Sequence, residues 1–309
     1  MVHVSDSRPR PNRRTALTLV AGTAVTTMWP LAGPPAHAAS RRGSLAGRLA
    51  ALEEEYGARL GLYAHDTATG RRLTHRARER FALCSTFKTL TAAAVLRDLD
   101  HDSSHLARRV HYTAEEVEPA GYIPVTGREE NLANGLTVAE LCAAAVSESD
   151  NGAANLLLRQ LGGPTAVTRF SRSLGDPVTR LDRYEPDLNS AEPWRTTDTT
   201  TPYALGRTNA RLLLGRALEP TDRRLLRRWL VENTTNGERF GKGLPDDWVL
   251  ADKTGGGDAY GVANDVGVVW PPGRSPIVLA VLSTTHDPAG PGQDALVART
   301  AGLVAEELT

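Results

Sequence analysis

Residues 85–99 read STFKTLTAAAVLRDL, and their apolar side chains recur at the spacing of one helix face. The pattern predicts a helix over 86–99 that begins near Ser85. Since positions i and i+3 of a helix face the same side, the amine of Lys88 can reach the hydroxyl of Ser85. A serine hydroxyl becomes a strong nucleophile only when a neighbouring base accepts its proton. The pair indicates an activated serine, although an isolated copy is more often a capping serine and a solvated lysine.

Strand-like segments lie far from this helix, towards both ends of the chain. Segments 60–65 and 73–75 form a predicted hairpin, and the later strand-like segments are 249–254, 262–270 and 277–283. Between them lie helical patterns over 137–147, 155–161, 164–174, 202–218 and 221–231, and a last helix is predicted over 289–308. This order predicts an α/β fold of the α+β type, in which both chain ends build one antiparallel sheet flanked by helices. The central segments form an inserted all-helical lobe, and we expect the active site between the two lobes.

Lysine is rare in this chain, since only 3 of the 36 basic residues are Lys. Two of the three lie in Ser85-Thr86-Phe87-Lys88 and Lys253-Thr254-Gly255. A lysine amine can lose its proton when it is buried, whereas a guanidinium remains charged. The distribution indicates that these two lysines serve a site.

Two motifs accompany the Ser85–Lys88 pair later in the chain. Ser149-Asp150-Asn151 joins two predicted helices, where a second hydroxyl can pass a proton to a leaving nitrogen and the Asn151 amide can bind a substrate carbonyl. Lys253-Thr254-Gly255 ends a strand-like segment and is followed by Gly256, so a substrate can approach the backbone closely. Taken singly, the first is more often a capped turn and the second a glycine bulge.

An acidic motif, Glu185-Pro186-Asp187-Leu188-Asn189, lies on a separate predicted loop. Hydrolysis of an acyl-enzyme needs a base that positions water on the ester carbonyl. The spacing of Glu185 and Asn189 allows the two side chains to hold one water between them.

Together these four motifs resemble the class A serine β-lactamases, and the resemblance covers about residues 45–305. It implies hydrolysis of the β-lactam amide bond of antibiotics through a Ser85 acyl-enzyme, which water activated by Glu185 then hydrolyses. It also implies an oxyanion hole from the backbone N–H groups of Ser85 and Gly256. The implied catalytic residues are Ser85, Lys88, Ser149 and Glu185, and the implied substrate-binding residues are Asn151, Asn189, Lys253, Thr254, Gly255, Gly256, Arg239 and Tyr122.

The resemblance assigns roles to several residues outside the motifs. Arg183 and Asp198 match the ion pair that closes the base of the loop of Glu185, although a solvated surface pair is the simpler interpretation. Arg239 lies where some members place an Arg under the substrate carboxylate, and Tyr122 matches the aromatic residue at the cleft mouth. The segment 124–136 is longer than in the family.

Two other activities share three of the motifs. A cell-wall D-alanyl-D-alanine peptidase is disfavoured because such enzymes lack the loop of Glu185. A β-lactam-sensing module would be acylated at Ser85 and remain acylated.

The two cysteines, Cys84 and Cys142, are expected to be unpaired. In relatives with disulfides, the partner positions correspond to Gly257 and Ala92 of this chain, neither of which is a cysteine. We predict two small buried apolar side chains.

The N-terminus has the composition of an export signal. Arginines including Arg13-Arg14 precede a weakly apolar run over 16–31, and Ala36-His37-Ala38 resembles a cleavage site. We predict a signal peptide over 1–38, by the twin-arginine or the ordinary secretory route, and a mature domain over 39–309 that is secreted. The apolar run is too short for a convincing membrane span.

The 36 basic and 36 acidic side chains leave the chain without net charge, which argues against nucleic-acid or membrane partners. None of the 8 histidines lies in a motif or at metal-ligand spacing, so we expect no metal and no organic cofactor. The expected partner is a small β-lactam substrate, and the expected state is a monomer.

Overall fold

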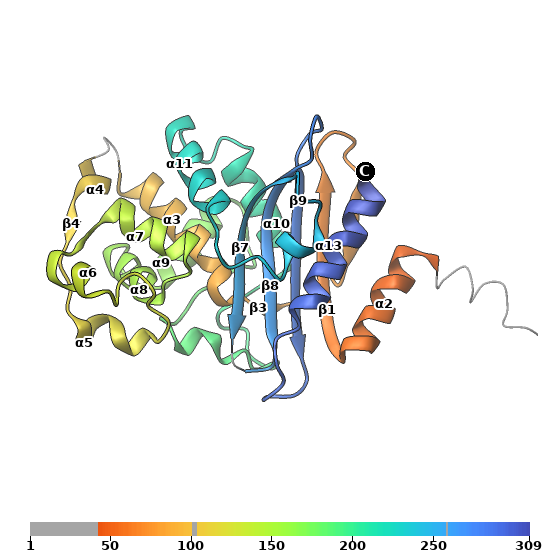
Figure 1. Cartoon of the computed structure of the whole chain (residues 1–309), viewed down its shortest axis with the longest axis horizontal. Helices are drawn as coiled ribbons and strands as arrows, with labels where there is room; N and C mark the ends of the chain where they lie inside the picture. Colours follow the sequence, from red (N-terminus) through yellow and green to blue (C-terminus); the bar gives the residue numbers. More distant parts are fainter. Residues whose placement is uncertain (1–42, 101–103, 258) are drawn as a thin grey trace, which may run out of the picture.

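A computed structural model describes residues 43–100, 104–257 and 259–309. It has two lobes, a helical one and one built on a β-sheet (Figure 1). The predicted signal peptide and its cleavage site lie outside the described residues.

Within those residues, five strands form one antiparallel sheet in the order β2-β1-β9-β8-β7. The first and last thirds of the chain meet in it, since Ala58 of β1 pairs with Thr285 of β9. The predicted sheet from both chain ends is therefore confirmed. The strands are β1 (Ala58–Asp66), β2 (Arg72–His75), β7 (Val249–Gly257), β8 (Val262–Trp270) and β9 (Ile277–Thr285).

Both faces of the sheet are covered, so its central strand is continuously apolar over residues 277–282 rather than alternating. In β9, Leu279 and Val281 belong to the core shared with the terminal helices α2 (Leu45–Tyr56) and α13 (Asp294–Leu308). Ala280 and Leu282 belong to the core on the opposite face, where α10 (Pro202–Leu213) packs on β9, β8 and β1.

The helical lobe surrounds α3 (Phe87–Asp98), which has a long buried stretch and packs on α7, α8, α9 and α11. The edge strand β7 lies nearest to this lobe (Figure 1). The remaining α-helices are α4 (Ser104–Ala107), α5 (Ala114–Val117), α6 (Glu129–Asn134), α7 (Val138–Ser147), α8 (Asn151–Gln160), α9 (Thr165–Ser173), α11 (Pro220–Val231) and α12 (Phe240–Gly243). The remaining elements of the described residues are short strands and 3-10 turns: β3 (Phe81–Ala82), β4 (Arg109–Val110), β5 (Leu136–Thr137), β6 (Thr199–Thr200), η1 (Cys84–Thr86), η2 (Glu118–Ala120) and η3 (Asp187–Ser190).

Several predicted boundaries were wrong for local reasons. Helix α8 begins at Asn151 rather than 155, because the Asp150 side chain accepts from Ala153 N and caps it. Helix α10 ends at Leu213 rather than 218, just before Gly215. Helix α13 begins at Asp294 rather than 289, because a Pro- and Gly-rich run precedes it.

Other differences are additions to the prediction. The N-terminal helix α2 was not predicted, and the long segment 124–136 contains α6. Strand β7 continues to Gly257 instead of ending near Thr254, since Gly257 still pairs with Val262.

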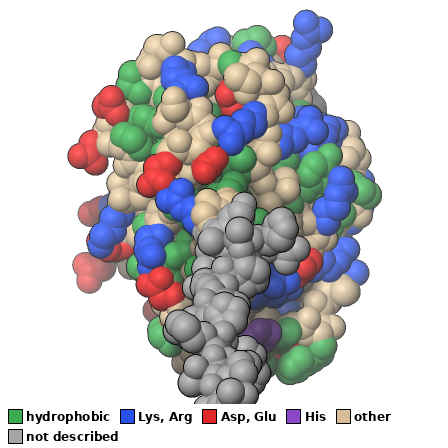
Figure 2. All heavy atoms as spheres, turned by 90° about the vertical axis from the view of Figure 1, so that its right-hand side faces the viewer, with side chains coloured by type: hydrophobic (Ala, Val, Ile, Leu, Met, Phe, Trp, Pro, Cys, Tyr) green, Lys and Arg blue, Asp and Glu red, His purple; other side chains and the backbone are tan. Residues whose placement is uncertain are grey.

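Side chains of both signs occur across the described part of the face in Figure 2. Among the residues the model describes, we find no helix with the length and apolarity needed to cross a bilayer.

Candidate active site

Ser85 lies in the 3-10 turn η1, immediately before α3. The preceding residue, Cys84, has a φ of 43°, which turns the chain sharply into the helix. Strand β7 runs close against this turn: a Cβ on Gly255 would lie 2.9 Å from the Leu83 carbonyl oxygen. Glycine at 255 therefore allows the edge strand to approach the serine.

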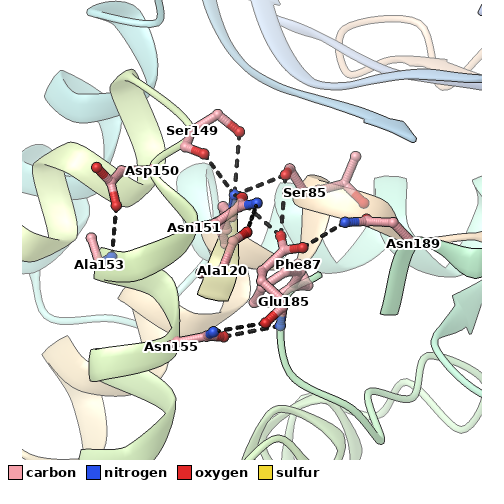
Figure 3. Close-up of polar contacts among 12 residues, drawn as sticks. Ser85, Phe87, Ala120, Ser149, Asp150, Asn151, Ala153, Asn155, Glu185 and Asn189 are labelled. Atoms are coloured by element: carbon pink, nitrogen blue, oxygen red, sulfur yellow. Dashed lines mark hydrogen bonds and ion pairs between the residues drawn. The ribbon is translucent and has the colours of Figure 1, made fainter. Parts of the chain in front are cut away.

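The amine of Lys88 is fully buried and lies at the centre of the polar network. Its Nζ donates to Ser85 Oγ at 2.8 Å, to the Ser149 carbonyl oxygen at 2.7 Å and to Asn151 Oδ1 at 2.5 Å. The Ser149 hydroxyl lies 3.4 Å away. The structure thus joins Ser85, Lys88 and Ser149. Figure 3 shows Ser85, Ser149, Asn151 and Glu185 gathered at this point.

Burial lowers the pKa of the Lys88 amine, because the charged form loses its hydration. The neighbouring Glu185 carboxylate opposes this shift, and its Oε1 lies 3.3 Å from Nζ. Lys88 is therefore placed to give up a proton more readily than an exposed lysine.

Glu185 meets both members of the Ser-Lys pair. Its Oε1 accepts from Ser85 Oγ at 3.5 Å, and its Oε2 accepts from Asn189 Nδ2 at 2.6 Å. The Asn189 Oδ1 atom is buried and has no partner in the described structure. This oxygen and the Glu185 carboxylate are acceptors for one water between them.

Asn155 fixes the backbone of Glu185, a role that the sequence did not reveal. Its Nδ2 donates to the Glu185 carbonyl oxygen at 2.9 Å, and its Oδ1 accepts from Glu185 N at 3.0 Å. Asn155 lies one turn after Asn151 on α8, so the same helix face serves Lys88 and Glu185. Asn155 is thus a positioning residue.

The predicted ion pair at the base of the Glu185 loop is present, and it is not a solvated surface pair. Arg183 Nε lies 2.6 Å from Asp198 Oδ2, and the Asp198 side chain is only 1% exposed. Its Oδ1 also accepts from the backbone N atoms of Asp182 and Arg183. The carboxylate therefore holds the beginning and the end of the loop together.

The Ser149-Asp150-Asn151 motif forms the wall on the helical side. Ser149 has a φ of 57°, and Asn151 Nδ2 donates to the Ala120 carbonyl oxygen at 2.9 Å. Asp150 accepts from Val125 N and Thr126 N at 2.9 and 2.8 Å. The long segment 124–136 is thereby attached to this motif.

Strand β7 forms the opposite wall. Thr254, Gly255 and Gly256 line the cleft, whereas Lys253 is only 1% exposed and does not contribute to its exposed lining. Burial, with the nearby charge of Lys88 as the next cause, holds the pKa of Lys253 well below its usual value. The Thr254 hydroxyl contacts that of Thr235.

The Arg239 guanidinium contacts strands β7 and β8 and the Asp294 carboxylate. Its Nη1 donates to the carbonyl oxygens of Gly255 and Asn264 at 2.7 and 2.6 Å, and its Nε lies 2.8 Å from Asp294 Oδ1. Arg239 also lines the cleft, and its Nη2 group lies beside Gly256.

These residues enclose a cleft of about 790 Å³ between the lobes, where the sequence predicted the site. Tyr122 lies at its edge and is 56% exposed. In the part of the chain that the structure covers, no group of three or more His, Cys, Asp or Glu side chains is arranged to hold a metal ion.

Both cysteines are buried and unpaired, as predicted. A Cβ on Gly257 would lie 3.5 Å from Cys84 Sγ, so the predicted partner position is the right one but holds no thiol. Burial raises the pKa of both thiols.

Comparison with known proteins agrees with this geometry. A model described as "Beta-lactamase enzyme family" matches residues 44–308. A β-lactamase of Kitasatospora aureofaciens is 61% identical over 305 residues, covering 97% of this chain and 98% of that protein.

Two solved structures are also similar. The β-lactamase of Streptomyces albus G has a TM-score of 0.84 at 60% identity, covering 85% of this chain and 98% of that one. An ancestral class A β-lactamase has a TM-score of 0.81 at 51% identity, with 86% of this chain and 100% of that chain covered.

Proposed function

The chain belongs to the beta-lactamase enzyme family, which hydrolyses the β-lactam amide bond through a serine acyl-enzyme, and we propose a role in that reaction for each residue of the cleft. The observation that supports these roles best is the contact of the Glu185 carboxylate with both Ser85 and Lys88. This contact places the nucleophile Ser85 within reach of two proton acceptors, Lys88 and Glu185.

Acylation begins at Ser85. Burial favours the neutral form of the Lys88 amine, which accepts the proton of Ser85 Oγ at 2.8 Å while Glu185 remains a carboxylate. Oγ attacks the β-lactam carbonyl carbon, and the C–N bond breaks. Ser149 donates its proton to the leaving nitrogen and is reprotonated from Lys88.

Charge that develops on the carbonyl oxygen is stabilised by the backbone N–H groups of Ser85 and Gly256. The close approach of β7 to η1 supports this assignment, since it brings the segment of Gly256 next to the turn of Ser85. Asn151 and Gly255 bind the acyl-amide side of the substrate, and Tyr122 contacts it at the mouth.

Deacylation uses Glu185 as the base. A water held between Glu185 and the unpartnered Asn189 Oδ1 attacks the ester carbonyl, and the water proton passes to the Glu185 carboxylate. As the C–O bond breaks, Glu185 returns this proton to Ser85 Oγ, 3.5 Å away, which releases the product acid and restores both side chains.

The substrate carboxylate lies against Thr254 and the Nη2 group of Arg239, and Lys253, next to Thr254 on β7, is the second cation, whose charged form the bound anion favours. Arg239→Ala is expected to lower kcat/KM by roughly ten- to a hundredfold, because one charge-assisted hydrogen bond is lost. An analogue esterified at this carboxylate has no anion to lose, so its kcat/KM should fall much less.

The matched control is Lys242→Ala, which removes a cation from the adjacent α12 without touching the cleft. Equal losses for acid and ester in Arg239→Ala would show that Arg239 only supports packing through Asp294, Gly255 and Asn264.

Turnover of a chromogenic cephalosporin by the mature protein tests the proposed roles as a whole. Many turnovers per active site are expected. A single stoichiometric burst followed by a stable acyl-enzyme would instead indicate a sensor or a peptidase-like protein in which Glu185 does not deacylate.

For the chain as a whole, we infer a signal peptide over 1–38 and a secreted, monomeric domain over 39–309 that acts on small β-lactams without metal or organic cofactor. The Arg-rich start, the apolar run and Ala36-His37-Ala38 support export. The N-terminal residue of the protein recovered from culture medium tests the cleavage site.

A further inference from the structure

A second cavity, of about 220 Å³, lies at the base of the loop that carries Glu185, away from the cleft. One wall is the segment 175–178, which leads into the loop, and the other is the start of α10, which follows it. The two walls are joined nearby, where the hydroxyls of Thr179 and Thr200 lie 2.6 Å apart. A ligand here would contact both stems of the loop.

Three arginines line this cavity, namely Arg78, Arg207 and Arg211. Arg207 Nη1 donates to the Tyr203 hydroxyl at 2.9 Å, and the Arg78 guanidinium lies 4.4 Å from the centre of the Tyr203 ring. Arg211 donates to the Leu174 carbonyl oxygen at the end of α9. These contacts hold the guanidinium groups in place and leave further N–H donors on each.

No carboxylate in the described residues forms an ion pair with any of the three. Asp176 lines the same cavity, but its Oδ1 accepts from Val178 N and Thr179 N, and its Oδ2 accepts from Thr208 Oγ1. By contrast, Arg183 and Arg239 near the cleft each have a carboxylate partner. With three guanidinium groups against one carboxylate, the lining of the cavity is positively charged overall.

Two of the three positive charges lie on the same face of α10. Arg207 and Arg211 are four residues apart, a spacing at which like charges destabilise a helix. The pKa of Tyr203 is lowered, first by its hydrogen bond with Arg207 and then by the charges of Arg207, Arg78 and Arg72. A bound anion would relieve this repulsion.

We propose that this cavity is a binding site for a compact oxyanion of the phosphate class. Guanidinium groups present paired N–H donors that match the oxygen geometry of phosphate. The volume of about 220 Å³ has room for several waters, and so for a compact anion such as phosphate or pyrophosphate. Bound there, the anion ties the segment of Arg78 to both loop stems and stabilises the folded protein.

The test is thermal unfolding and isothermal titration of the full mature protein with inorganic phosphate, against sodium chloride at equal ionic strength. Phosphate is expected to raise Tm with a saturable concentration dependence, and to bind at one site per chain. Arg207→Gln should weaken binding about tenfold or more, because it removes one charge-assisted contact. The double variant Arg207→Gln with Arg211→Gln should abolish it.

The matched control is Arg216→Gln, an exposed arginine just beyond α10 that does not line the cavity, and it should bind phosphate as the parent does. Phosphorus-31 line broadening on the unmodified protein gives a readout that does not depend on whether a variant folds. Absence of saturable binding to the parent at millimolar phosphate would overturn the proposal. So would equal phosphate affinity in the double variant and in Arg216→Gln.

Discussion

Ser85→Ala is expected to abolish both β-lactam turnover and covalent labelling by a penicillin. The variant keeps Lys88, Glu185 and the cleft, but it has no oxygen to form the ester. Removing the nucleophile of a comparable catalytic unit costs on the order of a millionfold in kcat. Intact-protein mass spectrometry should therefore find no adduct.

Ser173→Ala is the control, because its hydroxyl lies on α9 and contacts Phe170 rather than the cleft. This variant should acquire the penicilloyl mass as the parent does. A penicilloyl adduct on Ser85→Ala would show that another residue is the nucleophile.

Glu185→Gln is expected to separate the two halves of the reaction. The amide still fits between Lys88 and Asn189, but it cannot accept a proton from the attacking water. Loss of a general base lowers a rate by typically a hundredfold to ten-thousandfold, so the acyl-enzyme should accumulate. Mass spectrometry after mixing with a penicillin should show a long-lived adduct on a folded protein.

Glu192→Gln is the matched control, since it changes the same charge in the same loop and contacts Ser190 and Arg195 instead. It should deacylate like the parent. If Glu185→Gln neither labels nor turns over, Glu185 is required for acylation by Lys88 as well, and its role as deacylation base alone is wrong.

Local patterns were enough to predict the elements that carry the chemistry. Helix α3, the β1–β2 hairpin and strands β8 and β9 follow from hydrophobic period and turn residues. The pairing of Ser85 with Lys88 follows from helix geometry alone, which holds wherever the helix forms.

Features that depend on distant segments were not predictable in the same way. An Asn in a helix has many possible partners, and Asn155 finds Glu185 only because a loop thirty residues later returns to α8. Likewise, the near-complete burial of Lys253 cannot be read from its strand, because it depends on distant segments: Lys88 of α3 is close enough for its charge to lower the Lys253 pKa.

The pairing of β1 with β9 also constrains when the enzyme can become active during its synthesis. Strand β9 and helix α13 are made after the catalytic motifs, and β1 has no neighbour in the sheet other than β2 until β9 arrives. Contacts between such distant segments form slowly, because a long loop must close first. A nascent chain that already contains Ser85, Lys88 and Glu185 therefore lacks the completed sheet that carries β7, and we expect hydrolysis to start only once β9 has paired with β1.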